Sequence, residues 1–167
     1  DRDRCREAGI PDDVVYRPKS EIALELYDRA RVHGVEFDWV TFDEWYGTKP
    51  QFLRGLDQRT QKYVGEVHKH FYAWIDPPRV TRRPYRRGGR GRGKKVPRLV
   101  ARSRPALHVE DLLNYQLRKQ RWQKWRLKDG EKGPMVCEVK HALVYIPDEE
   151  GLPAGPYHLL IWRNVLK

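Results

Sequence analysis

Apolar residues first recur at a helical spacing over residues 19–33. They lie at every fourth position or beside one, at Ile22, Ala23, Leu26, Tyr27 and Ala30. This spacing predicts an amphipathic helix with Ser20 as its N-terminal cap. Gly34 follows the last repeat and predicts the end of the helix.

The next stretch alternates between strand and helix patterns. Residues 37–42 are rich in aromatic and β-branched side chains, which predicts a short strand ending at Asp43. Residues 50–59 predict a short helix with proline in its first turn and an apolar face of Phe52, Leu53 and Leu56. Residues 62–67 predict a second strand. A helix between two strands at this spacing predicts a parallel pair, and the fold class is therefore α/β.

The pattern changes at residue 76. Arginine, glycine and proline dominate up to residue 105, which predicts a flexible basic loop with little to bury. A helix is expected over 108–119, followed by strands at 122–127, 135–146 and 157–165 that form an antiparallel meander. We therefore expect three parts, namely residues 1–75, 76–105 and 106–167.

The net charge of +11 becomes informative when it is divided along the chain. Residues 1–75 contain 12 Lys and Arg against 14 Asp and Glu, and residues 129–167 contain 4 against 6. Residues 76–128 contain 18 against 3, so the whole excess lies there. Such an asymmetry indicates a polyanionic partner that contacts one region.

The remaining composition indicates the compartment. The chain has no apolar run long enough to span a membrane and no leader pattern, so we expect no membrane partner. Cys5 and Cys137 are far apart, which fits a reducing, cytoplasmic location and no Cys-based zinc module. The chain starts at Asp1 and its one methionine is Met135, so we expect a fragment of a longer protein.

Asp43 is the first candidate for chemistry. It lies at the carboxyl end of a predicted strand, where open α/β sheets bind ligands, and its carboxylate could hold a divalent metal. Glu44 is a weaker second candidate. The alternative interpretation is that Asp43 caps the turn into the following helix.

Two blocks of sequence resemble a known family. Residues 40–47 (VTFDEWYG) and the strand at 62–67 (KYVGEV) resemble the block around the second catalytic acid of DDE-type insertion-sequence transposases. Residues 4–11 (RCREAGIP) and 19–26 (KSEIALEL) resemble the segment that precedes that block. The resemblance covers about the first 70 residues.

The resemblance implies a partial RNase H-like parallel-sheet core, followed by a basic loop and a β-rich insertion. It makes Asp43 both a catalytic residue and a ligand of Mg²⁺ or Mn²⁺ in the complete protein. The family's first Asp is expected upstream of Asp1 and its Glu downstream of Lys167. Four late acids fall in a strand or an exposed turn and do not match that Glu: Glu138, Asp148, Glu149 and Glu150.

Basic residues form the second candidate site. Arginines and lysines of the loop are predicted to bind DNA phosphates: Arg82, Arg83, Arg86, Arg87, Arg90, Arg92, Lys94 and Lys95. A solvated, charge-biased tail is the alternative. Arg121, Lys124 and Arg126 alternate with tryptophans and are also predicted to bind DNA. Trp122 and Trp125 fit either a stacked base or a protein core.

Two other chemistries are not expected. His68 and His70 would share one face of a strand, but two imidazoles without a third ligand do not predict a zinc site. The glycines of residues 88–93 lack a preceding strand and a following helix, so no nucleotide cofactor is expected.

These observations predict a fragment of a DNA transposase that catalyses metal-dependent strand cleavage and strand transfer when an insertion sequence moves. The implied partners are double-stranded DNA, as transposon ends and target, and a second copy in a homodimeric DNA complex. The implied location is the bacterial cytoplasm, at the nucleoid when bound to DNA. The chain alone is expected to be inactive because two of three acids are absent. The alternatives are a non-catalytic nucleic-acid-binding remnant and an RNA-binding protein.

Overall fold

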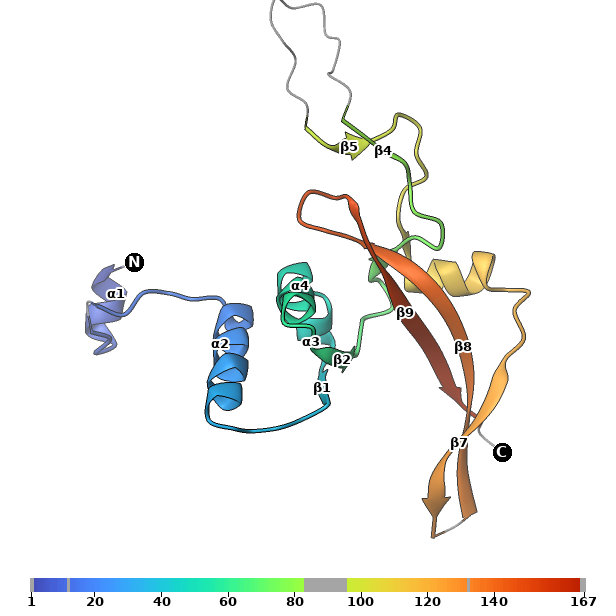
Figure 1. Cartoon of the computed structure of the whole chain (residues 1–167), viewed down its shortest axis with the longest axis horizontal. Coiled ribbons are helices and arrows are strands. Elements are labelled where there is room, and N and C mark those ends of the chain that lie inside the picture. The colour runs from blue at the N-terminus through green and yellow to red at the C-terminus, as the bar shows by residue number, and fades with distance from the viewer. Residues whose placement is uncertain (1, 12, 83–95, 132, 166–167) are drawn as a thin grey trace, which may run out of the picture. The chain divides into compact units, whose positions relative to one another are not determined.

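The chain forms two compact units, Asp1–Glu66 and Val67–Lys167, in a computed structural model (Figure 1). The structure describes residues 2–11, 13–82, 96–131 and 133–165. The fold is mixed α/β, with small sheets that are mostly antiparallel. The three-part division expected from the sequence stays a prediction.

The first unit begins with helices α1 (Arg2–Glu7) and α2 (Lys19–Val32). The expected cap at Ser20 is wrong, because Ser20 is buried inside the first turn of α2. Pro18 precedes the helix with φ −60° and ψ 143°, and its carbonyl accepts the N–H groups of Glu21 at 3.0 Å and Ile22 at 3.2 Å. The extended backbone of proline therefore starts the helix without a side-chain cap.

The apolar face expected for α2 is also partly wrong. Ile22 and Leu26 are 41% and 54% exposed, because α4 packs on a neighbouring face of the helix. That face carries Leu24, whose side chain lies against Gly55, and Asp28, which pairs with an arginine of α4's C-terminal end. Tertiary contacts, not the strongest sequence repeat, decide which face is inside.

Two strands and two helices follow, largely as the pattern predicts. They are β1 (Trp39–Phe42), α3 (Glu44–Gly47), α4 (Pro50–Gln58) and β2 (Lys62–Gly65). β1 and β2 pair in parallel, from Trp39 opposite Lys62 to Phe42 opposite Gly65, which confirms the predicted parallel pair. The predicted face of α4 is buried, and Pro50 is in its first turn.

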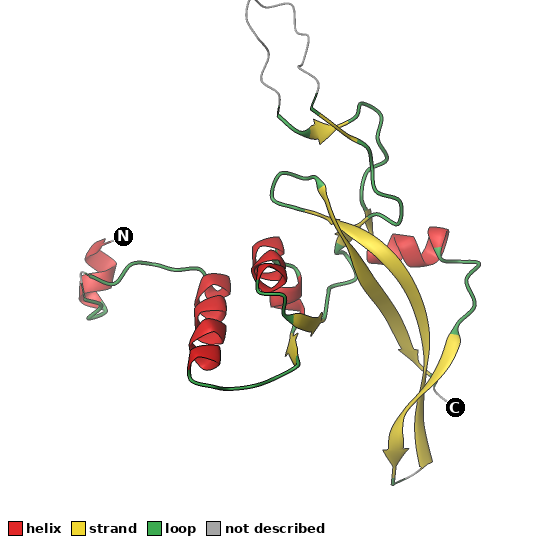
Figure 2. Ribbon diagram, in the orientation of Figure 1, coloured by secondary structure: helices red, strands yellow, loops and turns green. Residues whose placement is uncertain are grey.

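The second unit contains short strands and one long meander. β3 (Tyr72–Ala73) pairs with β6 (Leu107–His108), and β4 (Val80–Thr81) pairs with β5 (Arg98–Leu99), both antiparallel. β7 (Gln123–Gly130), β8 (Gly133–Pro147) and β9 (Pro153–Asn164) form an antiparallel sheet in chain order (Figure 2). The predicted meander is confirmed.

The helix expected over 108–119 is shorter and wider than predicted. It consists of α5 (Val109–Asp111) and the π-helical turn η1 (Leu112–Gln116). Val109, Leu112 and Leu117 are buried, and the Lys140 ammonium donates to the Leu117 carbonyl at 2.7 Å. A buried lysine of β8 therefore satisfies a carbonyl at the end of this helical segment.

Gly65 provides a test of the parallel pair. A Cβ added there would lie 2.0 Å from Cε2 of Phe42, so Gly65→Ala forces the ring or the strand to move. We expect a loss of about 1–3 kcal/mol in the free energy of unfolding, measured by urea denaturation. Val64→Thr is the control, because Val64 lies in the same strand and is 55% exposed. Equal stability of Gly65→Ala and wild type would contradict this packing.

The ion pair between α2 and α4 provides a pH test. Arg59 binds both carboxylate oxygens of Asp28 at 2.6 Å, and this hydrogen bonding holds the pKa of Asp28 below its usual 3.8. The stabilisation is therefore complete above pH 3.8 and is lost as the pH falls through the lowered pKa. Asp28→Asn should cost less than about 1 kcal/mol at pH 7, because the pair is partly exposed. The free energies of unfolding of wild type and Asp28→Asn, measured against pH, should converge in acid. A difference that stays constant with pH would exclude a contribution from the titration of Asp28.

Candidate active site and nucleic-acid interface

Asp43 directly follows β1 and caps the helix after it. Its Oδ1 accepts the backbone N–H groups of Trp45 at 3.1 Å and Tyr46 at 3.3 Å. The capping interpretation is therefore correct. Asp43 is exposed, and its Oδ2 forms no hydrogen bond or ion pair with the described residues. One carboxylate oxygen thus has a structural role while the other stays accessible to a ligand.

An aromatic cluster fixes the backbone around Asp43. The ring of Phe42 lies 5.0 Å from that of Phe52 and 5.6 Å from that of Tyr63, centroid to centroid. Tyr46 lies 5.0 Å from Phe52. These contacts join β1, α3, α4 and β2, so the residues on both sides of Asp43 are held by packing.

Glu66 is an acid near Asp43 that the sequence analysis did not consider. Its backbone N–H donates to the Phe42 carbonyl at 3.1 Å, which continues the parallel pairing one step beyond β2. Glu66 therefore leaves its strand at the same sheet end as Asp43. The sequence could have indicated Glu66 through the register of the two predicted strands, because Phe42 pairs with Gly65 and the next residues are Asp43 and Glu66. Glu44 is exposed as the first residue of α3.

The late acids lie where the sequence pattern predicts, in a strand or in a turn. Glu138 lies in β8 and binds Arg163 at 2.6 Å, while Asp148 accepts the N–H groups of Glu150 and Leu152 in a turn. No group of three or more His, Cys, Asp or Glu residues that could hold a metal ion occurs in the described parts of the chain.

The predicted basic loop is described only at its ends. Arg82 is exposed and directly follows β4. Seven of the predicted DNA-binding residues lie outside the described residues: Arg83, Arg86, Arg87, Arg90, Arg92, Lys94 and Lys95. Val80 pairs with Leu99, so β4 and β5 hold the two ends of this segment together.

An open hollow of about 320 Å³ lies beside β4 and β5, lined by residues 76–79 and 100–104. Arg79, Arg102 and Arg104 line it and are exposed, and within the described ranges their guanidinium groups form no ion pair. The hollow thus carries three free positive charges and one acid, Asp76. Guanidinium groups can bind a phosphate through charge-assisted hydrogen bonds.

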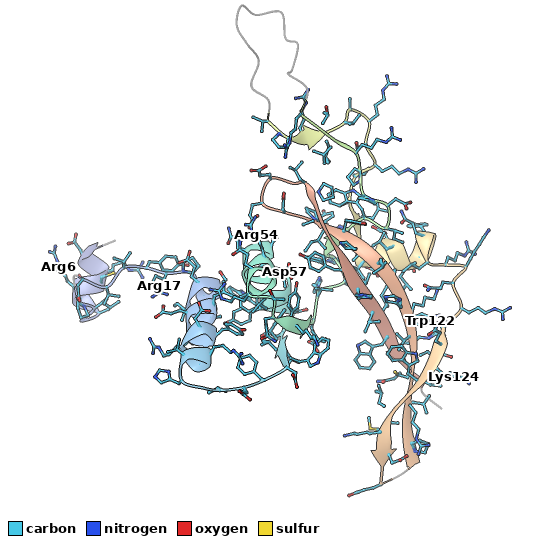
Figure 3. The ribbon with its side chains drawn as sticks, viewed as in Figure 1. Arg6, Arg17, Arg54, Asp57, Trp122 and Lys124 are labelled. Atoms are coloured by element: carbon cyan, nitrogen blue, oxygen red, sulfur yellow. The ribbon has the colours of Figure 1, made fainter. Side chains whose placement is uncertain are left out.

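The basic residues around β7 fall into two kinds. Arg121 and Lys124 are exposed and have no ionic partner among the residues that the structure describes. Lys124 lies in β7, two residues after Trp122 (Figure 3). Arg126 pairs with Asp129. Arg121 and Lys124 are therefore available to a DNA phosphate, whereas Arg126 would exchange one partner for another.

The two tryptophans of this segment differ in their surroundings. Trp122 is half-buried, with the Lys140 ammonium 4.8 Å and the Arg163 guanidinium 4.2 Å from its ring centroid. Trp125 is 43% exposed. Neither is fully buried in a core. Cations already contact the Trp122 ring, so Trp125 is the more accessible surface for an aromatic contact.

Three histidines gather although only two are close in sequence. The rings of His68 and His70 lie 4.8 Å apart, and His108 of β6 lies 5.2 Å from His70. Glu110 approaches His70 with Oε2 at 3.6 Å from Nε2. Pairing of β3 with β6 brings His108 there, and the spacing of residues alone could not indicate it.

No helix in the described part of the chain has the length and apolar character needed to cross a membrane.

The chain was compared with known proteins. The model of one family, described as DDE superfamily endonuclease, matches residues 1–134, which is more than half of the chain. Searches of curated proteins and of solved structures gave no significant match. The matched region contains Asp43, the aromatic cluster and the basic segment up to β7. The chain therefore belongs to the DDE superfamily endonuclease family.

Proposed function

We propose that the complete protein is a DNA transposase that cleaves DNA strands and transfers them during transposition of an insertion sequence. The observation that carries the proposal is the position of Asp43, at the carboxyl end of a parallel strand in a chain of this endonuclease family. Membership of the family implies a DNA substrate. The parallel pair β1 and β2 would then be two strands of an RNase H-like core.

Asp43 is proposed as one metal ligand, with Mg²⁺ or Mn²⁺ as the ion. Enzymes of this superfamily generally use divalent metals, and the free Oδ2 of an exposed carboxylate suits such an ion. A metal pair supplies activation of the attacking oxygen and stabilisation of the leaving oxygen. Asp43 alone cannot provide this site. We therefore propose that the complete protein supplies the other acids, and we expect no catalysis by these 167 residues alone.

The basic segment is proposed to hold DNA. Five basic residues support this proposal, because none of them has an ion pair with another described residue that a phosphate would first have to break: Arg79, Arg102, Arg104, Arg121 and Lys124. The arginines and lysines at 83–95 would add to the same interface. Transposon ends and target DNA are the proposed ligands, in a homodimeric complex at the bacterial nucleoid.

A second candidate function is a nucleic-acid-binding remnant without catalysis. It is favoured by the cations of the basic segment that have no ionic partner among the described residues, because they can bind a polyanion without any metal site. The two candidates differ in one respect that can be measured. Both bind DNA through the basic segment, but only the transposase cleaves it in a metal-dependent reaction.

The first test replaces the proposed ligand. In the complete gene product, Asp43→Asn should lower Mg²⁺-dependent strand cleavage by at least about 100-fold, since loss of a supporting outer residue alone costs 10–100-fold. The amide oxygen can still cap α3, so circular dichroism should be unchanged. Asp38→Asn, at the opposite end of β1, is the matched control and should cleave normally. Normal cleavage by Asp43→Asn would refute the assignment.

The second test measures DNA binding against salt. If six to ten cations meet phosphates, affinity of the complete protein for duplex DNA should fall by about 10³–10⁵ between 50 and 200 mM salt. Replacing Arg121 and Lys124 by glutamine should reduce the slope of log K against log[salt] by about 0.9 for each lost contact. Arg17→Gln serves as control, because Arg17 is paired with Glu25. An unchanged slope in the double variant would remove these residues from the interface.

A further inference from the structure

Two lysines gather on one tryptophan beside Asp43. The ammonium of Lys49 lies 4.9 Å and that of Lys19 lies 5.7 Å from the centroid of the Trp45 ring. Lys19 begins α2, Trp45 lies in α3, and Lys49 is the residue before α4, so three elements contribute to the cluster. Cation–π attraction holds both charges near the indole.

Both ammonium groups lack an acidic partner among the residues that the structure describes. Three arginines of the same unit do have acidic partners: Arg17 and Arg29 share Glu25, and Arg59 pairs with Asp28. An aromatic ring leaves the three N–H donors of an ammonium largely unused, whereas a carboxylate would engage them. Lys19 and Lys49 therefore keep both charge and hydrogen-bonding capacity for a ligand.

The cluster is joined directly to Asp43. The Trp45 backbone N–H donates to Asp43 Oδ1 at 3.1 Å, and the Trp45 carbonyl accepts the Thr48 hydroxyl at 3.0 Å. The Lys49 N–H donates to the Tyr46 carbonyl at 3.0 Å, which ties the residue before α4 to the same turn. The indole and Lys49 are thus held on the turn that Asp43 caps.

This sheet end otherwise carries negative charge, from Asp43, Glu44 and Glu66. A DNA strand that approached these carboxylates would be repelled by them. Cations beside the acids, with no acidic partner among the described residues, would offset this repulsion and could bind the phosphates directly.

We propose that Lys19 and Lys49, positioned by Trp45, bind backbone phosphates of the DNA strand that is presented to Asp43. This inference rests on the proposed function and adds a substrate-binding site to it. Trp45 acts as a positioning residue, because it holds the ammonium groups and need not touch the DNA. The ligand is a phosphodiester of the nucleic-acid backbone, so binding here should not depend on base sequence.

The same unit contains a matched control. Lys62 lies over the Trp39 ring at 5.8 Å, and these two residues form the first pair of the parallel strands. The Lys62 and Trp39 pair therefore has the same chemistry at the opposite end of β1 and β2 from Asp43. Lys62→Gln should remove a cation without touching the proposed site.

The experiment compares three variants of the complete gene product with wild type. The variants are Lys19→Gln/Lys49→Gln, Lys19→Arg/Lys49→Arg and Lys62→Gln. Binding to a fluorescent DNA duplex is measured without metal between 50 and 400 mM salt, and Mg²⁺-dependent cleavage is measured separately. In the glutamine double variant, the slope of log K against log[salt] should become shallower by about 1.8. If affinity at 1 M salt is unchanged, this corresponds to binding about 60-fold weaker than wild type at 0.1 M salt. The arginine variant and Lys62→Gln should bind like wild type.

The outcomes separate this inference from the proposed function. If wild type cleaves DNA but the glutamine double variant keeps the wild-type slope, the inference is overturned and the proposed function stands. A double variant that loses no more affinity than Lys62→Gln also overturns it. If wild type does not cleave DNA but the slope of the glutamine double variant falls as expected, the lysine site is supported and the transposase proposal fails. Absence of DNA binding by wild type would overturn both.

Discussion

The approach of the Phe42 ring to the backbone of Gly65 is the contact on which the first unit depends. The ring occupies the space of a side chain at that position, so β1 and β2 can pair in parallel up to their last residues. Phe42 also contacts Phe52 and Tyr63, so one ring joins both strands to α4. A rigid strand end is what a metal ligand needs, since a small displacement of a carboxylate weakens coordination. If Asp43 binds a metal as proposed, the packing behind it is part of that site.

Capping and metal binding are compatible roles for Asp43. A carboxylate has two oxygens, and the two N–H groups of α3 use only Oδ1. The cap fixes the direction of the side chain, which reduces the entropy that an ion would otherwise have to overcome. From the sequence, helix capping and metal binding were alternative roles for Asp43, because a sequence does not show which carboxylate oxygen accepts the N–H groups of the helix. The structure shows that the first role leaves the second open, and the family match supports the second.

Local patterns predicted the elements well, and tertiary geometry accounts for most of what they missed. The parallel pair and the meander followed from alternation and turn residues. Glu66 was missed because its place beside Asp43 depends on strand register, and His108 because it joins His70 through pairing of β3 with β6. The cap at Ser20 was wrong because Pro18 already imposes an extended residue before the helix. The π-helical turn η1 was not predicted, because apolar residues spaced three or four apart indicate an α-helix and do not distinguish a π-helical turn from it.

Formal charge and charge available to a ligand are different quantities in this protein. Residues 76–128 contain 18 basic residues against 3 acidic ones, yet Arg126 is engaged by Asp129. In the first unit, where acids outnumber bases, Lys19 and Lys49 lie on an indole and have no acidic partner among the described residues. A cation that must first leave a carboxylate gains little from a phosphate, whereas one held on an aromatic ring loses only a weak contact. In the proposed DNA complex, affinity should therefore depend on the cations without a carboxylate partner, and a unit with net negative charge could still contribute to it.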